Sequence, residues 1–314
     1  MTRPLVAITG ATGFIGGRLV STLTDAGYDV RALTRRTPPR EAVQNVSWVQ
    51  GALDDEESLR ALVKNVAFVV HVAGAIKARN RAEFLSVNAD GTRRLATAAA
   101  AQSIPPRFIH LSSIAARAPT LSTYAASKRA SEQALNSFGM LRPVILRPPA
   151  VYGPGDMETL KIFQMAANGY IVAPAADGAK FSLVHVEDVT RAVLAAMHLG
   201  QSPTRPIEFD DGHPGGYTWP ELVAATGAAL NKTPRLLWIP SPLVYAAGLG
   251  GSVYGLLTGR PNVLSWDKVG ELLHPDWVAS GESLPGYNPL WNIEKGFKDA
   301  VSWYKSRGLL KSNG

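Results

Sequence analysis

The chain has 314 residues, of which 46% are hydrophobic, and it carries a formal net charge of +7. It contains no cysteine, which excludes disulfides, thiolate metal sites and a cysteine nucleophile, and we predict no metal site of any kind. The positive charge suits an anionic cofactor, and we predict no nucleic-acid partner because the basic residues are scattered and lack the pattern of a recognition module.

The first predicted strand, residues 4 to 8, leads directly into a glycine turn and then a helix. Gly10 would allow a sharp reversal, Gly13 would leave no side chain between the backbone and a pyrophosphate, and Gly16 would let the helix lie close to the sheet. The helix N-terminus would then offer free N–H groups to phosphate. The GxxGxxG spacing therefore predicts a dinucleotide site formed by Gly10, Thr12, Gly13, Phe14, Ile15 and Gly16.

A pair of arginines follows the second predicted strand, residues 28 to 33. A carboxylate at that position would accept hydrogen bonds from the adenosine ribose of NAD, but the residues here are Thr34, Arg35 and Arg36. Two guanidiniums suit a ribose that carries a 2′-phosphate, so we predict that NADP(H) is preferred over NAD(H). The alternative interpretation is a solvated basic loop.

Short apolar runs alternate with Ala-rich helical stretches up to about residue 150, which predicts βαβ units. The later strand candidates are 46–49, 67–72, 107–111 and 143–147. We expect an α/β fold, a Rossmann-type doubly wound parallel sheet with a smaller, irregular C-terminal substrate lobe. The NADP-binding domain is expected over 1–155, with 182–200 returning to it, and 156–314 is expected to form mainly the substrate-binding lobe.

Tyr124 and Lys128 lie four residues apart in a predicted helix, and therefore on one face of it. A free Tyr has a pKa near ~10, and a nearby ammonium favours the phenolate, so the pair suits general acid–base catalysis. Ser113 lies just after the fifth predicted strand, at the edge of the sheet where α/β sites lie, and can hydrogen-bond a substrate oxygen. We interpret His71, at the end of the fourth strand, as structural.

Together these residues resemble the extended short-chain dehydrogenase/reductases, the NAD-dependent epimerase/dehydratase family. The segment from Arg147 to Gly155 looks closest to the 3β-hydroxysteroid dehydrogenase-like and complex I accessory-subunit-like members, and the tail is similar to bacterial reductases of ceramide synthesis. The resemblance implies that Tyr124 donates a proton, Lys128 holds the nicotinamide ribose and Ser113 orients the carbonyl. It adds Asn88 as a support of the active-site helix or a water relay. It also implies cofactor contacts from Leu53, Ala73, Gly74, Tyr124, Lys128, Pro149 and Val151.

The run from Leu236 to Leu257 contains no charged residue, and its length approaches the ~20 residues of a membrane span. Its prolines and glycines argue against a span. We expect a buried helix that lines the substrate pocket, and contact with a membrane surface is the alternative. Either interpretation suits an apolar, lipid-like substrate.

The sequence thus predicts an NADPH-dependent oxidoreductase that reduces a ketone on a lipid-like small molecule, with a 3-oxo-sphingoid or 3-oxo-ceramide as the sharpest candidate. A nucleotide-sugar epimerase and a non-catalytic NADP(H)-binding structural subunit are the alternatives. The first residues show no signal peptide, so we expect a cytoplasmic protein, with peripheral membrane contact left open. The sequence leaves the oligomeric state open.

Overall fold

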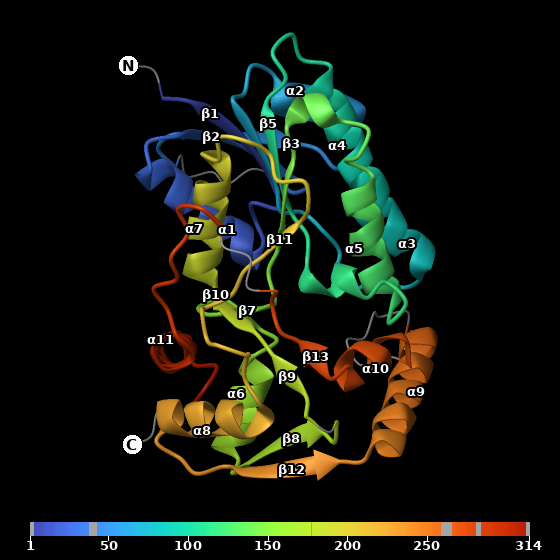
Figure 1. Cartoon of the computed structure of the whole chain (residues 1–314), viewed down its shortest axis with the longest axis vertical. Helices are drawn as coiled ribbons and strands as arrows, with labels where there is room; N and C mark the ends of the chain where they lie inside the picture. Colours follow the sequence, from blue (N-terminus) through green and yellow to red (C-terminus); the bar gives the residue numbers. More distant parts are fainter. Residues whose placement is uncertain (1–2, 38–42, 177, 259–265, 281–283, 312–314) are drawn as a thin grey trace. The chain divides into compact units, whose positions relative to one another are not determined.

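The chain is divided into two units, each built from separate segments. The first comprises Met1–Arg147, Thr190–Ile207 and Ser283–Tyr287, and the second comprises Pro148–Val189, Glu208–Glu282 and Asn288–Gly314 (Figure 1). The structure is a computed structural model that describes residues 3–37, 43–176, 178–258, 266–280 and 284–311, without the side chains of 253–257. Each unit has its own hydrophobic core.

A seven-stranded sheet of order β11-β6-β5-β4-β1-β2-β3 organises the first unit. Its strands are β1 (Leu5–Thr9), β2 (Asp29–Thr34), β3 (Val46–Gln50), β4 (Phe68–His71), β5 (Arg107–Leu111), β6 (Val144–Arg147) and β11 (Ile207–Glu208). From β3 to β6 every neighbouring pair is parallel. β1 lies between β2 and β4, so the chain changes direction across the sheet there, and ligands bind at such switch points. The predicted Rossmann-type sheet is confirmed, and its six predicted strands lie close to their expected bounds.

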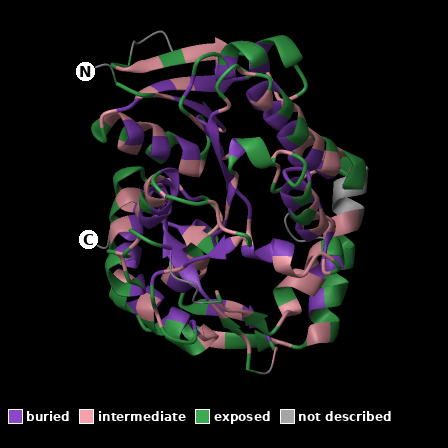
Figure 2. Ribbon diagram, turned by 45° about the horizontal axis from the view of Figure 1, so that its top comes forward, coloured by how far each residue is buried: buried purple, intermediate pink, exposed green. Residues whose placement is uncertain are grey.

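Helices cover both faces of this sheet (Figure 1). One face carries α1 (Phe14–Asp25) and the part of α7 (Val186–Met197) that belongs to the first unit, and the other carries α2 (Glu56–Val63), α4 (Gly91–Ala100) and α5 (Thr123–Gln133). Covered on both faces, the central strands are almost wholly buried (Figure 2). Shorter elements connect them: α3 (Arg81–Leu85), the π-helical turn η1 (Ser86–Asp90), and the 3₁₀ turns η2 (Ile114–Arg117) and η3 (Gly139–Leu141).

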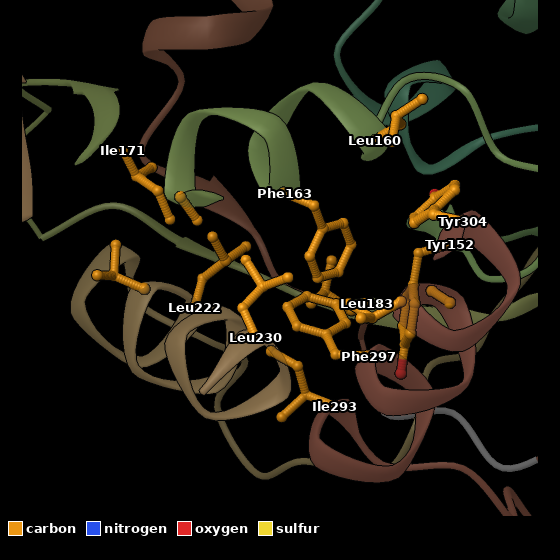
Figure 3. Packing of buried hydrophobic residues seen from close by; sticks show 14 of the residues in the cluster. Tyr152, Leu160, Phe163, Ile171, Leu183, Leu222, Leu230, Ile293, Phe297 and Tyr304 are labelled. Atoms are coloured by element: carbon orange, nitrogen blue, oxygen red, sulfur yellow. The ribbon is translucent and has the colours of Figure 1, made fainter. Parts of the chain in front are cut away.

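The core of the second unit lies among α6 (Leu160–Ala167), α8 (Trp219–Leu230) and α11 (Ile293–Ser306) (Figure 3). The Phe297 ring lies 5.1 Å from the ring centroids of both Tyr152 and Phe163, edge to face in each case. Three small parallel sheets accompany these helices: β7 (Ala150–Tyr152) with β10 (Leu183–His185), β8 (Tyr170–Pro174) with β12 (Arg235–Ile239), and β9 (Lys180–Phe181) with β13 (Asp276–Trp277).

The uncharged run corrects one expectation, because it is not a buried helix. It forms β12 and then α9 (Ser241–Thr258), which packs on α10 (Trp266–Leu273). Leu243 is 60% exposed, Leu249 55% and Tyr245 40%. The neighbouring residues on α9 are mostly Gly, Ala and Ser, whose short side chains leave the larger ones exposed. Among the residues that the structure describes, no helix is long and apolar enough to cross a membrane.

Candidate active site

The glycine turn forms a cradle that only glycine can build. Gly10 has a φ of +77°, and a Cβ there would lie 2.7 Å from the Ala73 nitrogen. A Cβ on Gly16 would lie 2.0 Å from the Gly10 carbonyl oxygen, so α1 can approach the turn this closely only without a side chain. Gly13 precedes the helix without a side-chain cap, which leaves the first amides of α1 available. The cradle therefore fits the pyrophosphate of a dinucleotide.

The other predicted cofactor residues lie in both units. Thr12 is exposed, and Phe14 and Ile15 are half-buried at the start of α1. Leu53 packs on Gly91 at the start of α4, where an added Cβ would come within 2.9 Å of Leu53 Cδ1. Pro149 and Val151 belong to the second unit, where Val151 lies in β7, and their place beside the nicotinamide stays a prediction.

The two arginines lie at the carboxyl end of β2. Both are exposed, and neither guanidinium has an ion-pair partner among the described residues. Thr34 is buried, and its hydroxyl accepts a hydrogen bond from the Arg36 N–H at 3.2 Å, which holds the backbone of the turn that carries the two arginines. Arg35 and Arg36 are therefore available to bind an anionic group at the edge of the sheet.

Helix α5 carries the predicted Tyr124 and Lys128 one turn apart. Its first turn is capped by Ser122, whose hydroxyl accepts a hydrogen bond from the Ala125 N–H at 2.9 Å. Tyr124 is half-buried, whereas Lys128 is buried and its ammonium donates to the Leu111 carbonyl at 3.1 Å. Burial lowers the pKa of Lys128 to about 8, and the negative charge of Glu132 opposes that shift. The lysine can therefore change its charge near neutral pH.

Asn88 lies in the π-helical turn η1, a type of distortion that often occurs at functional sites. Its amide oxygen accepts a hydrogen bond from the Ala75 N–H at 2.7 Å, and its amide nitrogen donates to the Ala75 carbonyl at 3.1 Å. The nitrogen also donates to the Ser127 hydroxyl at 2.8 Å, and Ser127 in turn donates to the Tyr124 carbonyl at 2.7 Å. Asn88 therefore connects the loop after β4 to helix α5.

These groups meet beside Gly74. A Cβ on Gly74 would lie 3.2 Å from the Asn88 amide oxygen and 3.3 Å from the Lys128 ammonium. Ser113 caps η2, accepting a hydrogen bond from the Ala115 N–H at 3.2 Å, and η2 packs on α5. The structure thus brings Asn88, Lys128 and Gly74 together at the edge of the sheet that also carries the glycine turn.

A buried ion pair behind Lys128 was not predicted. Glu132 follows Lys128 by one helical turn, and Arg147 contacts its two carboxylate oxygens at 2.8 Å and 2.6 Å. The Ser112 hydroxyl donates to the same carboxylate at 2.6 Å. Spacing along α5 places Glu132 near Lys128, but Arg147 comes from a distant strand, and nothing local in the sequence joins the two.

Comparison with known proteins shows the family to which the chain belongs. Residues 6–208 match the model of the NAD dependent epimerase/dehydratase family. The chain is 39% identical to a ceramide reductase from Caulobacter vibrioides, over 99% of this chain and 98% of that protein. It is 25% identical to a 3-beta-hydroxysteroid dehydrogenase from Mycolicibacterium neoaurum, over 95% of this chain and 91% of that protein.

Solved structures share the fold. The crystal structure of gox2253 has a TM-score of 0.77 and 22% identity, and covers 98% of this chain and 99% of its own. Human epimerase family protein SDR39U1 with NADPH has a TM-score of 0.73 and 19% identity, covering 95% and 99%. With the family model matched over most of the chain, this protein belongs to the NAD-dependent epimerase/dehydratase family, the extended short-chain dehydrogenase/reductases, and is an NAD(P)-dependent oxidoreductase.

Proposed function

We propose that this chain is an NADPH-dependent reductase that delivers hydride to a ketone on a hydrophobic, lipid-like substrate, with a 3-oxo-sphingoid or 3-oxo-ceramide as the sharpest candidate. The observation that carries the proposal is the convergence of the Lys128 ammonium and the Asn88 amide beside Gly74, next to the glycine turn. The similarity to a ceramide reductase over nearly the whole chain supports this choice of substrate.

Each polar residue of the site has a distinct task in this reaction. NADPH, when bound, supplies the hydride. Tyr124 donates its hydroxyl proton to the ketone oxygen, so that the carbonyl becomes an alcohol. The Lys128 ammonium favours the phenolate that remains and holds the nicotinamide ribose. Ser113 donates a hydrogen bond that orients the carbonyl, and Asn88 supports Tyr124 through Ser127.

The preference for NADPH is assigned to Arg35 and Arg36. Both guanidiniums are exposed at the carboxyl end of β2, and Arg remains charged at every physiological pH. The cofactor's 2′-phosphate would take donors from these two side chains, while the amides of the glycine turn hold the pyrophosphate.

The lipid-like substrate is supported by an apolar surface on the second unit. The elements β12, α9 and α10 carry exposed large hydrophobic side chains: Leu237, Trp238, Leu243, Tyr245, Leu249, Trp266 and Leu272. Lys232 and Arg235, both exposed, precede them. Aromatic rings favour the boundary between lipid and water, and basic residues favour anionic headgroups. We place a peripheral contact with an anionic membrane on this surface, where the enzyme would meet its substrate.

Vesicle flotation tests this contact. The protein should float with vesicles that contain phosphatidylglycerol and bind less to pure phosphatidylcholine. Leu243→Glu combined with Leu249→Glu should remove the binding, since both side chains are exposed and folding does not need them. Ile104→Glu is the matched control, because Ile104 is an exposed hydrophobic residue of the first unit. If the double variant floats like the wild type, the contact lies elsewhere or does not exist.

A nucleotide-sugar epimerase is the second candidate, because the chain is also 25% identical to UDP-glucose 4-epimerase from Vibrio cholerae, over 94% of both proteins. An epimerase returns its cofactor unchanged after each turnover, whereas a reductase consumes it. Net loss of NADPH therefore separates the two functions.

Purified protein should oxidise NADPH when a 3-oxo-sphingoid base or its N-acyl derivative is added, and mass spectrometry should find the corresponding alcohol. Tyr124→Phe should lower turnover by ~10²–10⁴-fold while NADPH affinity stays within a few fold, because only the proton donor is lost. UDP-glucose should cause no oxidation. Interconversion of UDP-sugars without loss of cofactor would contradict the reductase assignment and support the epimerase.

A further inference from the structure

Two fully buried histidines lie side by side behind the site. His71 in β4 and His110 in β5 are partners in the parallel register, 0% and 1% exposed. Their rings stack at a centroid distance of 5.2 Å and an interplanar angle of 22°. Neither belongs to the proposed Ser113, Tyr124 and Lys128 set. Burying a polar ring costs free energy unless the ring is hydrogen-bonded, and apolar residues could fill the same space without that cost. The presence of two histidines here therefore directs attention to the hydrogen bonds that they make.

His71 is connected to Asn88 through one hydroxyl. Thr92 donates its only hydroxyl proton to the Asn88 carbonyl at 2.6 Å. In its second contact, at 2.9 Å, the Thr92 hydroxyl oxygen must therefore accept a hydrogen bond from His71 Nε2. His71 therefore carries its proton on Nε2. Its bare Nδ1 accepts from the Thr9 hydroxyl at 2.7 Å, and Thr9 in turn accepts from the Ala73 N–H at 3.3 Å. The hydrogen bonds thus run in one direction from the sheet edge to η1.

His110 makes the same connection to Lys128. Ser131 donates its hydroxyl proton to the Lys128 carbonyl at 2.7 Å, and so accepts from His110 Nε2 at 2.9 Å. Nδ1 of His110 has no hydrogen-bond partner in the described part of the chain, which fits an unprotonated nitrogen. Burial lowers the pKa of His71 to about 3 and that of His110 well below its usual value, so both rings stay neutral.

We propose that His71 and His110 are positioning residues, which fix Asn88 and Lys128 relative to one another by holding the backbone carbonyl of each through Thr92 and Ser131. The assignment rests on the proposed function of that site. A Ser or Thr hydroxyl that bonds back to its own helix, with nothing else holding it, slightly destabilises the helix and often bends it. Here each hydroxyl is held by a ring on a central strand, and the two rings are stacked.

The site leaves little room for misplaced groups. The Gly74 backbone lies close to the Asn88 oxygen and the Lys128 ammonium, with 3.2 Å and 3.3 Å to an added Cβ. A displacement of about 1 Å in a site of this kind can cost ~10²-fold in rate. Loss of one histidine connection should therefore lower kcat without removing the cofactor site.

Variants of Thr92 separate positioning from simple packing. Thr92→Val keeps the shape and removes the hydroxyl, so kcat should fall by about 10- to 100-fold while the KM for NADPH changes little. Thr92→Ser keeps the hydroxyl and loses a methyl group in a fully buried position, so kcat should remain near wild type although thermal stability falls. A purely structural residue would give activities that follow the melting temperatures. The proposal would be overturned if kcat followed the melting temperature across the variants, or if the Thr92→Val enzyme had a normal kcat.

A matched control lies in the second unit. Thr226 is fully buried, and its hydroxyl bonds back to the Leu222 carbonyl at 2.7 Å without a histidine behind it. Thr226→Val should leave kcat unchanged. Ser131→Ala is the parallel test of the His110 connection and should lower kcat and shift the alkaline limb of the pH profile.

A measurement without substrate distinguishes failure of this proposal from failure of the reductase assignment. Amide hydrogen exchange across Ser86–Asp90, recorded with and without NADPH, should become faster in Thr92→Val and stay normal in Thr92→Ser. If no ketone lipid is reduced by the wild type but this difference appears, the function is wrong and the positioning stands. If exchange is the same in all three proteins, the positioning is wrong whatever the substrate is.

Discussion

Replacing Gly16 with alanine should disable the cofactor site, whereas the same change at Gly17 should not. A Cβ on Gly16 would lie 2.0 Å from the Gly10 oxygen and 2.6 Å from the Gly10 carbonyl carbon, and both are backbone atoms of the turn. Favourable heavy-atom contacts lie near 3.5–4.0 Å, so α1 must withdraw by roughly 1.5 Å. A Cβ on Gly17 would lie 3.7 Å from the Ala11 oxygen, which is an ordinary contact.

The displacement of α1 sets the expected changes in stability and in NADPH affinity. Overpacking at Gly16 should cost ~1–3 kcal/mol of stability, partly offset by the ~1 kcal/mol that alanine gains over glycine in a helix. Gly17→Ala keeps the helical gain and should be neutral or stabilising. Charge-assisted hydrogen bonds contribute ~1.5–3 kcal/mol each, so the loss of a single amide–phosphate bond should weaken NADPH binding by roughly 10- to 150-fold.

Titration of NADPH by protein fluorescence, together with thermal unfolding, measures both effects. Gly16→Ala should remain folded at room temperature, with a lower melting temperature and much weaker binding, while Gly17→Ala should bind as the wild type does. Normal NADPH binding by Gly16→Ala, or an equal loss of affinity in both variants, would show that the close contact with Gly10 does not set the geometry of the site.

Replacing both Arg35 and Arg36 with alanine should weaken NADPH binding and leave NADH binding nearly unchanged; a wild type that binds both cofactors equally would contradict the assignment. Glu132→Gln should lower the free energy of unfolding by ~3–5 kcal/mol, because the buried Arg147 guanidinium loses the carboxylate charge that it pairs with. It should also move the alkaline limb of the kcat profile to lower pH, since Glu132 raises the pKa of Lys128 and the ammonium would be lost earlier. In a homologous series of 3-oxo lipids below their micelle-forming concentrations, kcat/KM should rise with chain length, by ~0.8 kcal/mol per buried methylene, and a flat series would favour the epimerase.

The sheet was predictable from the sequence because its signals are local. Each of the six predicted strands is a short run rich in apolar residues, and Gly10 and Gly16 follow the first of them at a spacing typical of a tight strand–turn–helix connection. The two-residue strand β11 was not predicted, because Ile207–Glu208 has no such run. Helical periodicity likewise predicts Tyr124 and Lys128 on one face of a helix, and both lie one turn apart in α5. Inferences of this kind need only a few neighbouring residues, so contacts with distant parts of the chain do not alter them.

The environment of the site was not predictable in the same way. Glu132 in α5 meets Arg147 in β6, and His71 in β4 meets His110 in β5, so each contact joins two different elements of the fold. Chain spacing says nothing about such partners. Burial of the uncharged run was predicted wrongly for a related reason. A stretch without charged residues, such as that around Leu243 and Leu249, can be buried or exposed, and contacts with distant parts of the chain decide which.

One hydrogen-bond pattern recurs at all three helical residues of the proposed site. The backbone carbonyls of Asn88, Tyr124 and Lys128 each accept from a hydroxyl three or four residues later. Those hydroxyls in turn accept from the side chains of His71, Asn88 and His110 respectively, and each of these side chains belongs to another element.

Asn88 takes part in this pattern twice, because its backbone is held through His71 while its side chain holds the turn that carries Tyr124. A disturbance at His71 therefore has a continuous path to Tyr124, whereas a disturbance at His110 reaches Lys128 through Ser131 alone. Loss of the His71 connection should accordingly affect the proton donor and Asn88 together. Loss of the His110 connection should act first on the pKa and placement of the lysine, and so appear in the pH profile.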